Sequence, residues 1–193
     1  MTSKGIARIA CAVSLSFCCS AAAQGLERHN RQAIGVEYLV PEDEDNRDIR
    51  IATISVAREH YLRWGLWLRG AVGMAFTEGV LIPDEGPQSV ALEADGLGLG
   101  GAGYLRWRPV TGDLIGPFVE GGLGMLFTTE PFPPGRTVWN FSPKYGLGAE
   151  LDVSVRFNLV IAYRHVHFSN GKGFGHPRNP SYDGNGIVLA ISW

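Results

Sequence analysis

The sequence predicts an all-β protein, an eight-stranded antiparallel transmembrane β-barrel. Apolar and polar residues alternate along successive segments, as in strands that have one face in lipid and the other in a lumen. The connections between these segments alternate between short and long. Beyond the N-terminal segment, no stretch offers the ~18 consecutive apolar residues that a membrane helix needs. Strands closed into a barrel are therefore the expected architecture.

Residues 1–23 are typical of a secretory signal peptide. Lys4 and Arg8 flank the start of an apolar stretch, IACAVSLSFCC, which small residues (SAAAQ) follow. We expect cleavage after Ala23, which leaves residues 24–193 as one barrel domain. The apolar run is short for a retained anchor. A lipoprotein signal would need a small residue before its cysteine, and Phe17 precedes Cys18.

The composition of the mature chain excludes several classes of protein. All three cysteines lie within the signal segment, so no disulfide can hold the exported chain together. Removing two of the 17 Lys+Arg leaves 15 against 19 Asp+Glu, a net charge of −4. This balance gives no reason to expect nucleic-acid binding, and no basic run suggests a membrane-surface patch.

Eight strands and their connections can be assigned in order. The strands are expected at 31–40, 48–58, 62–77, 94–108, 116–129, 142–153, 155–169 and 182–193. Connections after the second, fourth and sixth strands are short (EHY, PVTGDLI and near Ser154), whereas the others are longer and polar or rich in Pro and Gly. Outer-membrane barrels have this asymmetry, with short periplasmic turns and long outer loops. A soluble lipocalin-like barrel has no reason to show it.

The last strand also favours a membrane barrel. One face carries large apolar side chains, and the other carries small ones. The first face has Ile187, Leu189, Ile191 and Trp193, and the second has Val188, Ala190 and Ser192. Large apolar residues outward and small residues inward suit a narrow barrel in lipid, although an ordinary amphipathic strand is the alternative reading.

The seventh strand carries an unusual polar cluster. His165, His167 and Ser169 alternate, so they share one face. Arg164 lies on the other face, and an arginine facing lipid near the bilayer midplane costs about 2–4 kcal/mol. The odd face, apolar up to Tyr163, is therefore the lipid face. Because this strand runs outward into a long loop, the cluster should face lipid near the outer rim.

These residue types at this spacing can support nucleophilic catalysis. A serine hydroxyl needs a nearby base, and the base needs an orienting partner. His167 lies two residues from Ser169 on the same face. Asp183, on the neighbouring last strand, has the same odd parity as Ile187, so its carboxylate should reach the histidine. Ser169, His167 and Asp183 are the predicted catalytic residues.

The segment HFSNGKG, followed by RNPSYDGNGI and a terminal strand, resembles the lipid A 3-O-deacylases of the PagL family. GPFVEGGLG (116–124) is similar to that family's fifth strand. The resemblance implies an eight-stranded outer-membrane barrel with a Ser–His–acid site on its outer surface. It also implies that His167 is the base and Ser169 the nucleophile, and that the oxyanion hole is formed by Asn170 with a backbone N–H of Gly171 or Gly173.

The sequence departs from that family at the acid. Better-known members have Glu where Asp183 aligns, and their connection from the serine is a little shorter. If Asp183 were not the acid, Glu120 and Glu150 would be the next carboxylates to consider. His165 and Arg178 are candidate substrate-binding residues, although His165 can equally mark the membrane interface. His176 is a further candidate for phosphate contact, and Trp64, Trp67, Trp107 and Trp139 are expected in interfacial girdles.

The expected function is an outer-membrane esterase of the Gram-negative cell, acting on lipid A or lipopolysaccharide without a cofactor. A non-enzymatic barrel serving adhesion or membrane integrity stays open, as does a phospholipase on the same barrel. A homodimer is a further open arrangement. The two histidines could instead share a zinc ion with Asp183 as the third protein ligand, but nothing else in the chain indicates metal chemistry.

Overall fold

The structure, a computed structural model, describes residues 30–42, 47–81, 91–109, 114–134, 137–170 and 181–193. The predicted signal peptide lies outside these residues. Within them no helix is long and apolar enough to cross a membrane. The strands are β1 (Asn30–Pro41), β2 (Arg47–Arg63), β3 (Leu66–Leu81), β4 (Leu92–Glu93), β5 (Gly96–Trp107), β6 (Ile115–Thr128), β7 (Trp139–Asp152), β8 (Asn158–Phe168) and β9 (Tyr182–Ser192).

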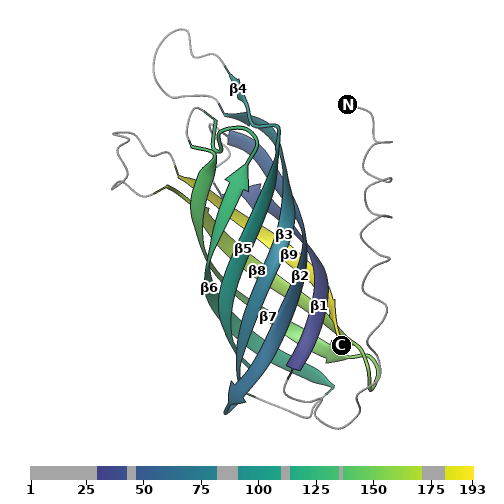
Figure 1. The fold of residues 1–193 in the computed structure, drawn as a ribbon. Helices are drawn as coiled ribbons and strands as arrows, with labels where there is room; N and C mark the ends of the chain where they lie inside the picture. The colour runs from purple at the N-terminus through teal and green to yellow at the C-terminus, as the bar shows by residue number, and fades with distance from the viewer. Residues whose placement is uncertain (1–29, 43–46, 82–90, 110–113, 135–136, 171–180) are drawn as a thin grey trace, which may run out of the picture.

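Eight of these strands close into an antiparallel barrel, as the sequence predicts. The order is β2-β1-β9-β8-β7-β6-β5-β3, and pairing of β2 with β3 completes the ring. The two-residue β4 only extends the outer end of β3. In Figure 1 the strands run obliquely round the barrel, with β4 beyond one end and the C-terminus at the other. Closure leaves no unpaired sheet edge, which a membrane-spanning sheet requires.

The two faces of the barrel strands alternate as predicted. On β9, Ile187 is 50% exposed and Leu189 is 45% exposed, whereas Val188 and Ala190 between them are buried. On β8 the same alternation exposes Tyr163 and buries Arg164. The outer surface of these two strands is therefore apolar over their middle, where the charged Arg164 points inward.

Three of the four connections at one end (82–95, 129–138 and 169–181) are longer than any at the other end (64–65, 108–114 and 153–157), but 42–46, which was expected to be long, is not. A second prediction is also wrong in detail: the first short turn is not at Glu59–Tyr61, because β2 continues to Arg63. The turn is Trp64–Gly65, with φ values of 53° and 77°. Two-residue hairpin loops of type I′ need positive φ at both positions, and a Cβ on Gly65 would lie 2.0 Å from the Arg108 carbonyl oxygen. Glu59 is instead a buried interior residue.

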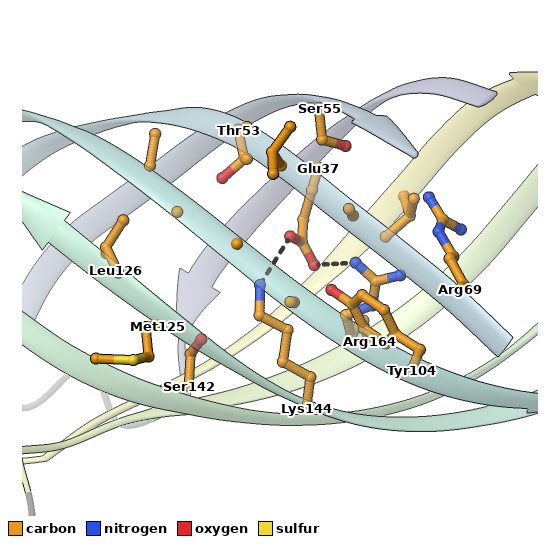
Figure 2. A pocket seen from close by; sticks show the side chains of 18 of the residues that line it. Glu37, Thr53, Ser55, Arg69, Tyr104, Met125, Leu126, Ser142, Lys144 and Arg164 are labelled. Atoms are coloured by element: carbon orange, nitrogen blue, oxygen red, sulfur yellow. Dashed lines mark hydrogen bonds and ion pairs between the residues drawn. The ribbon is translucent and has the colours of Figure 1, made fainter. Parts of the chain in front are cut away.

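Ion pairs fill the middle of the barrel interior. Glu120 accepts hydrogen bonds from Arg106 (Nη2–Oε2, 2.8 Å) and from Arg164. Arg164 and Lys144 both reach Glu37, at 2.9 and 3.6 Å. Figure 2 shows both of these contacts inside the barrel. Arg164 and Lys144 are thus compensated by Glu37 on a strand distant in sequence, whereas Arg106 is compensated by Glu120 on the adjacent β6.

A second ion-pair group lies toward the short-turn end. Glu150 is buried and accepts from Arg108 (2.8 Å) and from Arg31. Glu120 and Glu150 are therefore committed to arginines inside the barrel. Neither can serve as the alternative acid for a serine on the outer face.

An apolar cluster closes the interior at the long-loop end. It includes Phe132, Val166, Phe168 and Tyr182. The ring centroids of Phe132 lie 5.6 Å from those of both Phe168 and Tyr182, and the Tyr182 hydroxyl donates to the Ile49 carbonyl oxygen at 2.9 Å. These side chains alternate with the polar residues of β8 and β9. The outward-facing cluster is therefore supported from behind by a packed core.

The tryptophan girdle is only partly as predicted. Trp64 and Trp107 are exposed, as interfacial residues should be. Trp67 is 5% exposed and contacts Tyr61 and Arg31, so it lies inside the barrel. The prediction for Trp67 was wrong, because its position in β3 after the Trp64–Gly65 turn directs its side chain into the barrel.

Candidate active site

The candidate active site lies on the outer face of β8 and β9, at their long-loop end. His165, His167 and Ser169 are partly exposed, and the intervening Val166 and Phe168 are buried. Strand alternation alone produces this arrangement. The structure therefore brings the three predicted polar residues of β8 to one surface.

Ser169 is held by the end of the sheet. β8 proper ends at Phe168, and a single bridge to Phe141 extends the pairing by one residue. The Ser169 N–H donates to the Phe141 carbonyl at 3.1 Å, and the Phe141 N–H donates to the Ser169 carbonyl at 2.8 Å. The serine backbone is thus fixed by β7, and its side chain keeps the parity of His167.

Asp183 lies directly opposite His167 in the β8–β9 register. The His167 Nδ1 and the Asp183 Oδ1 are 2.6 Å apart, a short charge-assisted contact. With Nδ1 donating to the carboxylate, the tautomer leaves Nε2 as the ring nitrogen that can accept a proton from a hydroxyl. This is the relation between acid and base that a serine nucleophile requires.

His165 is part of the same cluster rather than an isolated interfacial residue. Its Nδ1 lies 3.0 Å from the Asn185 Oδ1, and its Nε2 lies 3.7 Å from the Asp183 Oδ1. Its ring stacks on Tyr145, with centroids 4.7 Å apart. Asp183 is therefore flanked by two imidazoles. The role of His165 in substrate binding stays a prediction.

The sequence interpretation missed three neighbours of this cluster: Asn185, Tyr145 and Glu42. Asn185 shares the odd parity of Asp183, so alternation could have found it. Tyr145 depends on the β7–β8 register, in which it lies opposite His165. Glu42 follows β1, and its N–H donates to the Asp183 carbonyl at 2.9 Å. No local sequence signal connects β1 to β9.

Asn170 does not share the face of Ser169. The residue is 3% exposed, and its Nδ2 donates to the Thr137 Oγ1 at 3.3 Å. Its side chain is thus on the buried side of the chain, as strand parity requires for the residue after Ser169. A role for Asn170 in the oxyanion hole stays a prediction. Gly171, Gly173, His176 and Arg178 lie outside the described residues.

The surface below the cluster is apolar. Tyr163 and Ile187 form the next outward-facing cross-strand pair below His165 and Asn185. Two residues along a strand correspond to about 7 Å. The polar cluster therefore begins immediately above the lipid-facing band, at the depth where hydrocarbon gives way to polar headgroups.

Comparison with protein-family models matches residues 52–192 to the family described as lipid A 3-O-deacylase (PagL). No curated protein sequence matches the chain. Among solved structures, the outer membrane enzyme PagL is similar, with a TM-score of 0.57 and 16% identity, over 82% of this chain and 97% of that one.

Two further outer-membrane barrels share the fold. Neisserial surface protein A (NspA) has a TM-score of 0.56 and 10% identity, over 84% of this chain and 94% of that one. OprG from Pseudomonas aeruginosa has a TM-score of 0.52 and 10% identity, over 89% and 99%. Identities this low support the fold alone. The family match covers more than two thirds of the chain, from β2 to the end of β9, and the protein therefore belongs to the lipid A 3-O-deacylase (PagL) family of Gram-negative outer-membrane β-barrels.

Proposed function

We propose that this protein is a serine esterase that removes the ester-linked 3-position hydroxyacyl chain of lipid A, with Ser169, His167 and Asp183 as its catalytic residues. The observation that carries the proposal is the 2.6 Å contact between the His167 Nδ1 and the Asp183 Oδ1, on the same outward face as Ser169. A lipid-facing surface has no structural need for such a group, because unpaired polar atoms facing hydrocarbon are costly.

The proposed reaction has two steps. The Ser169 Oγ attacks the ester carbonyl carbon while the His167 Nε2 takes its proton, and the Asp183 carboxylate stabilises the imidazolium. The tetrahedral intermediate breaks its bond to the lipid A oxygen, which leaves as an alcohol with the proton from His167. Water, deprotonated by His167, then hydrolyses the acyl-serine and releases the fatty acid. No cofactor takes part in this chemistry.

The location of the cluster supports a substrate embedded in the outer leaflet. Above Tyr163 and Ile187, an ester at headgroup depth can reach Ser169 while its acyl chain stays against the apolar band. The substrate then moves to the enzyme within the plane of the membrane. Family membership favours lipid A over a glycerophospholipid. The homodimer considered from the sequence has no support in these observations.

The test is mass spectrometry of lipid A from a Gram-negative host that expresses the full chain. The wild type should release one hydroxyacyl group per lipid A, and Ser169→Ala should leave lipid A at its original mass. Ser55→Ala, the same change on β2, is the matched control and should behave as wild type. Unchanged lipid A with the wild type, or loss of acyl chains from phospholipids instead, would contradict the proposal.

A further inference from the structure

Three ligand-bearing side chains converge beside the proposed site. Glu42, His165 and Asp183 each offer one atom, and these atoms all lie within 4.8 Å of one another. They come from the end of β1, from β8 and from β9, so closure of the barrel is what brings them together. Imidazole with carboxylates is a donor set that suits zinc.

The geometry of His165 is that of a metal ligand. Its Nδ1 donates to the Asn185 Oδ1 at 3.0 Å, which leaves the lone pair of Nε2 directed toward the Asp183 Oδ1, 3.7 Å away. Histidines that bind zinc usually donate their other ring N–H to a carbonyl or carboxylate in this way. Two ligands about 2.0 Å from a tetrahedral ion lie about 3.3 Å apart, close to the separation here.

Glu42 can supply the third ligand once its side chain rotates. Its backbone is fixed by the hydrogen bond to the Asp183 carbonyl, and its side chain is 57% exposed. The Glu42 Oε2 lies 3.7 Å from the His165 Nδ1, so its carboxylate faces the ring nitrogen that donates to Asn185. Because the side chain is exposed, rotation can carry the carboxylate from this side of the ring toward the Asp183 Oδ1 and the ion, and water can occupy the fourth position.

We infer that Glu42, His165 and Asp183 form a Zn²⁺ site, and that zinc bound there inhibits the esterase. The inhibition rests on the proposed function. The Asp183 oxygen that faces the His165 Nε2 is the one that accepts from the His167 Nδ1. An ion that takes this oxygen weakens its contact with His167, and the base then loses its orienting partner. The cluster thus couples metal occupancy to catalysis.

Binding can be measured without activity. Tag-free, full-length Ser169→Ala, folded in detergent, is titrated with ZnCl₂ by calorimetry. One ion per chain should bind, and Glu42→Gln or His165→Gln added to this background should weaken binding by roughly tenfold or more, since even indirect contacts to zinc contribute that much. His60→Gln, which changes an exposed histidine away from the cluster, is the control. Absence of a stoichiometric site, or binding unaffected by both changes, would overturn the metal site.

Inhibition is measured on the wild type and on Glu42→Gln, which keeps Ser169, His167 and Asp183. Hydrolysis of lipid A in metal-free buffer should fall at least tenfold at saturating zinc and recover with a chelator. Glu42→Gln should need roughly tenfold more zinc for the same effect, and calcium should not replace zinc. Equal sensitivity of both proteins would overturn the inhibitory role. Inactivity of the wild type in metal-free buffer would contradict the proposed function, and the titration would still decide the metal site.

Discussion

The inner and outer faces of this barrel both carry ionisable side chains, but the two sets are built differently. Inside, each glutamate is matched to an arginine or lysine: Glu120 contacts Arg106 and Arg164, and Glu150 contacts Arg108. Outside, Asp183 contacts two histidines, and the pair His165–Asn185 separates it from the apolar band that begins at Tyr163 and Ile187. Guanidinium groups keep their charge and form permanent pairs. Imidazoles gain and lose protons near neutral pH.

This difference separates the residues that stabilise the barrel from those that can catalyse a reaction. The interior pairs can neutralise buried charge and hold strands at fixed positions, but they offer no group that can exchange a proton at neutral pH. The outer cluster has such groups, together with a hydroxyl on the same face. Changes inside the barrel should therefore affect stability, and changes in the outer cluster should affect turnover.

The largest effect is expected for the nucleophile and its base. Ser169→Ala and His167→Ala should each lower turnover by roughly 10⁴-fold or more, and the double variant should be no slower, because the two groups act as a unit. Heat-modified migration on gels and urea midpoints should stay those of the wild type, since both side chains are at the surface. Near-normal turnover in either single variant would remove these residues from the mechanism.

An interior substitution should show the opposite behaviour. Glu120→Ala leaves Arg106 and Arg164 without a shared carboxylate, and breaking a buried pair costs about 3–5 kcal/mol of folding free energy. Urea unfolding in lipid measures this loss, and Glu130→Ala, an exposed glutamate in the loop after β6, is the control. Turnover per folded molecule should change little. A hundredfold loss of turnover in a folded Glu120→Ala barrel would refute the separation of the two faces.

A smaller loss of turnover is expected for the acid. Asp183→Asn keeps the size of the side chain but removes the charge, and should lower turnover by roughly 10²–10³, less than the ~10⁴ seen for a buried triad acid. Because Asp183 already lies 2.6 Å from His167, Asp183→Glu should overshoot and lose activity, by about 10²-fold for a 1 Å displacement. The control is Asp152→Asn, which makes the same change at the short-turn end of the barrel, away from the site. Full activity of Asp183→Asn would exclude the carboxylate.

The smallest effect is expected at Asn170. Its side chain is buried and donates to Thr137, so Asn170→Ala should lower turnover by less than tenfold while reducing stability by about 1 kcal/mol. Loss of a true oxyanion donor costs about 10²–10³ in turnover. Kinetics of the purified variant decide between these values, and a loss of turnover in the higher range would place the Asn170 amide in the oxyanion hole.

Local periodicity was sufficient to predict most of the barrel and the central part of the site. Alternation assigned the faces of β8 and β9, and with them the common outward face of His167 and Asp183, whereas the β8–β9 register sets the two residues opposite each other. The face assignments follow from a spacing of two residues, which needs no knowledge of distant neighbours.

The errors concern features that depend on the register between strands or on the exact position of a turn. Trp67 was expected in the interfacial girdle from its residue type alone, and its position after the Trp64–Gly65 turn places it inside the barrel. The contacts of Asp183 with Glu42 and of His165 with Tyr145 depend on which residues of β1 and β7 lie opposite the site. Glu120 lies opposite Arg106 in the β5–β6 register, and its contact with Arg164 joins β6 to β8 through the barrel interior.

The most direct test of the central claim is covalent labelling of the full-length protein in lipid bilayers with a long-chain alkyl fluorophosphonate, followed by peptide mass mapping. We expect a single adduct on Ser169, formed at least 10²-fold more slowly in His167→Ala because the hydroxyl then lacks its base. An adduct on another residue, or labelling of Ser169 at the same rate without His167, would contradict the central claim.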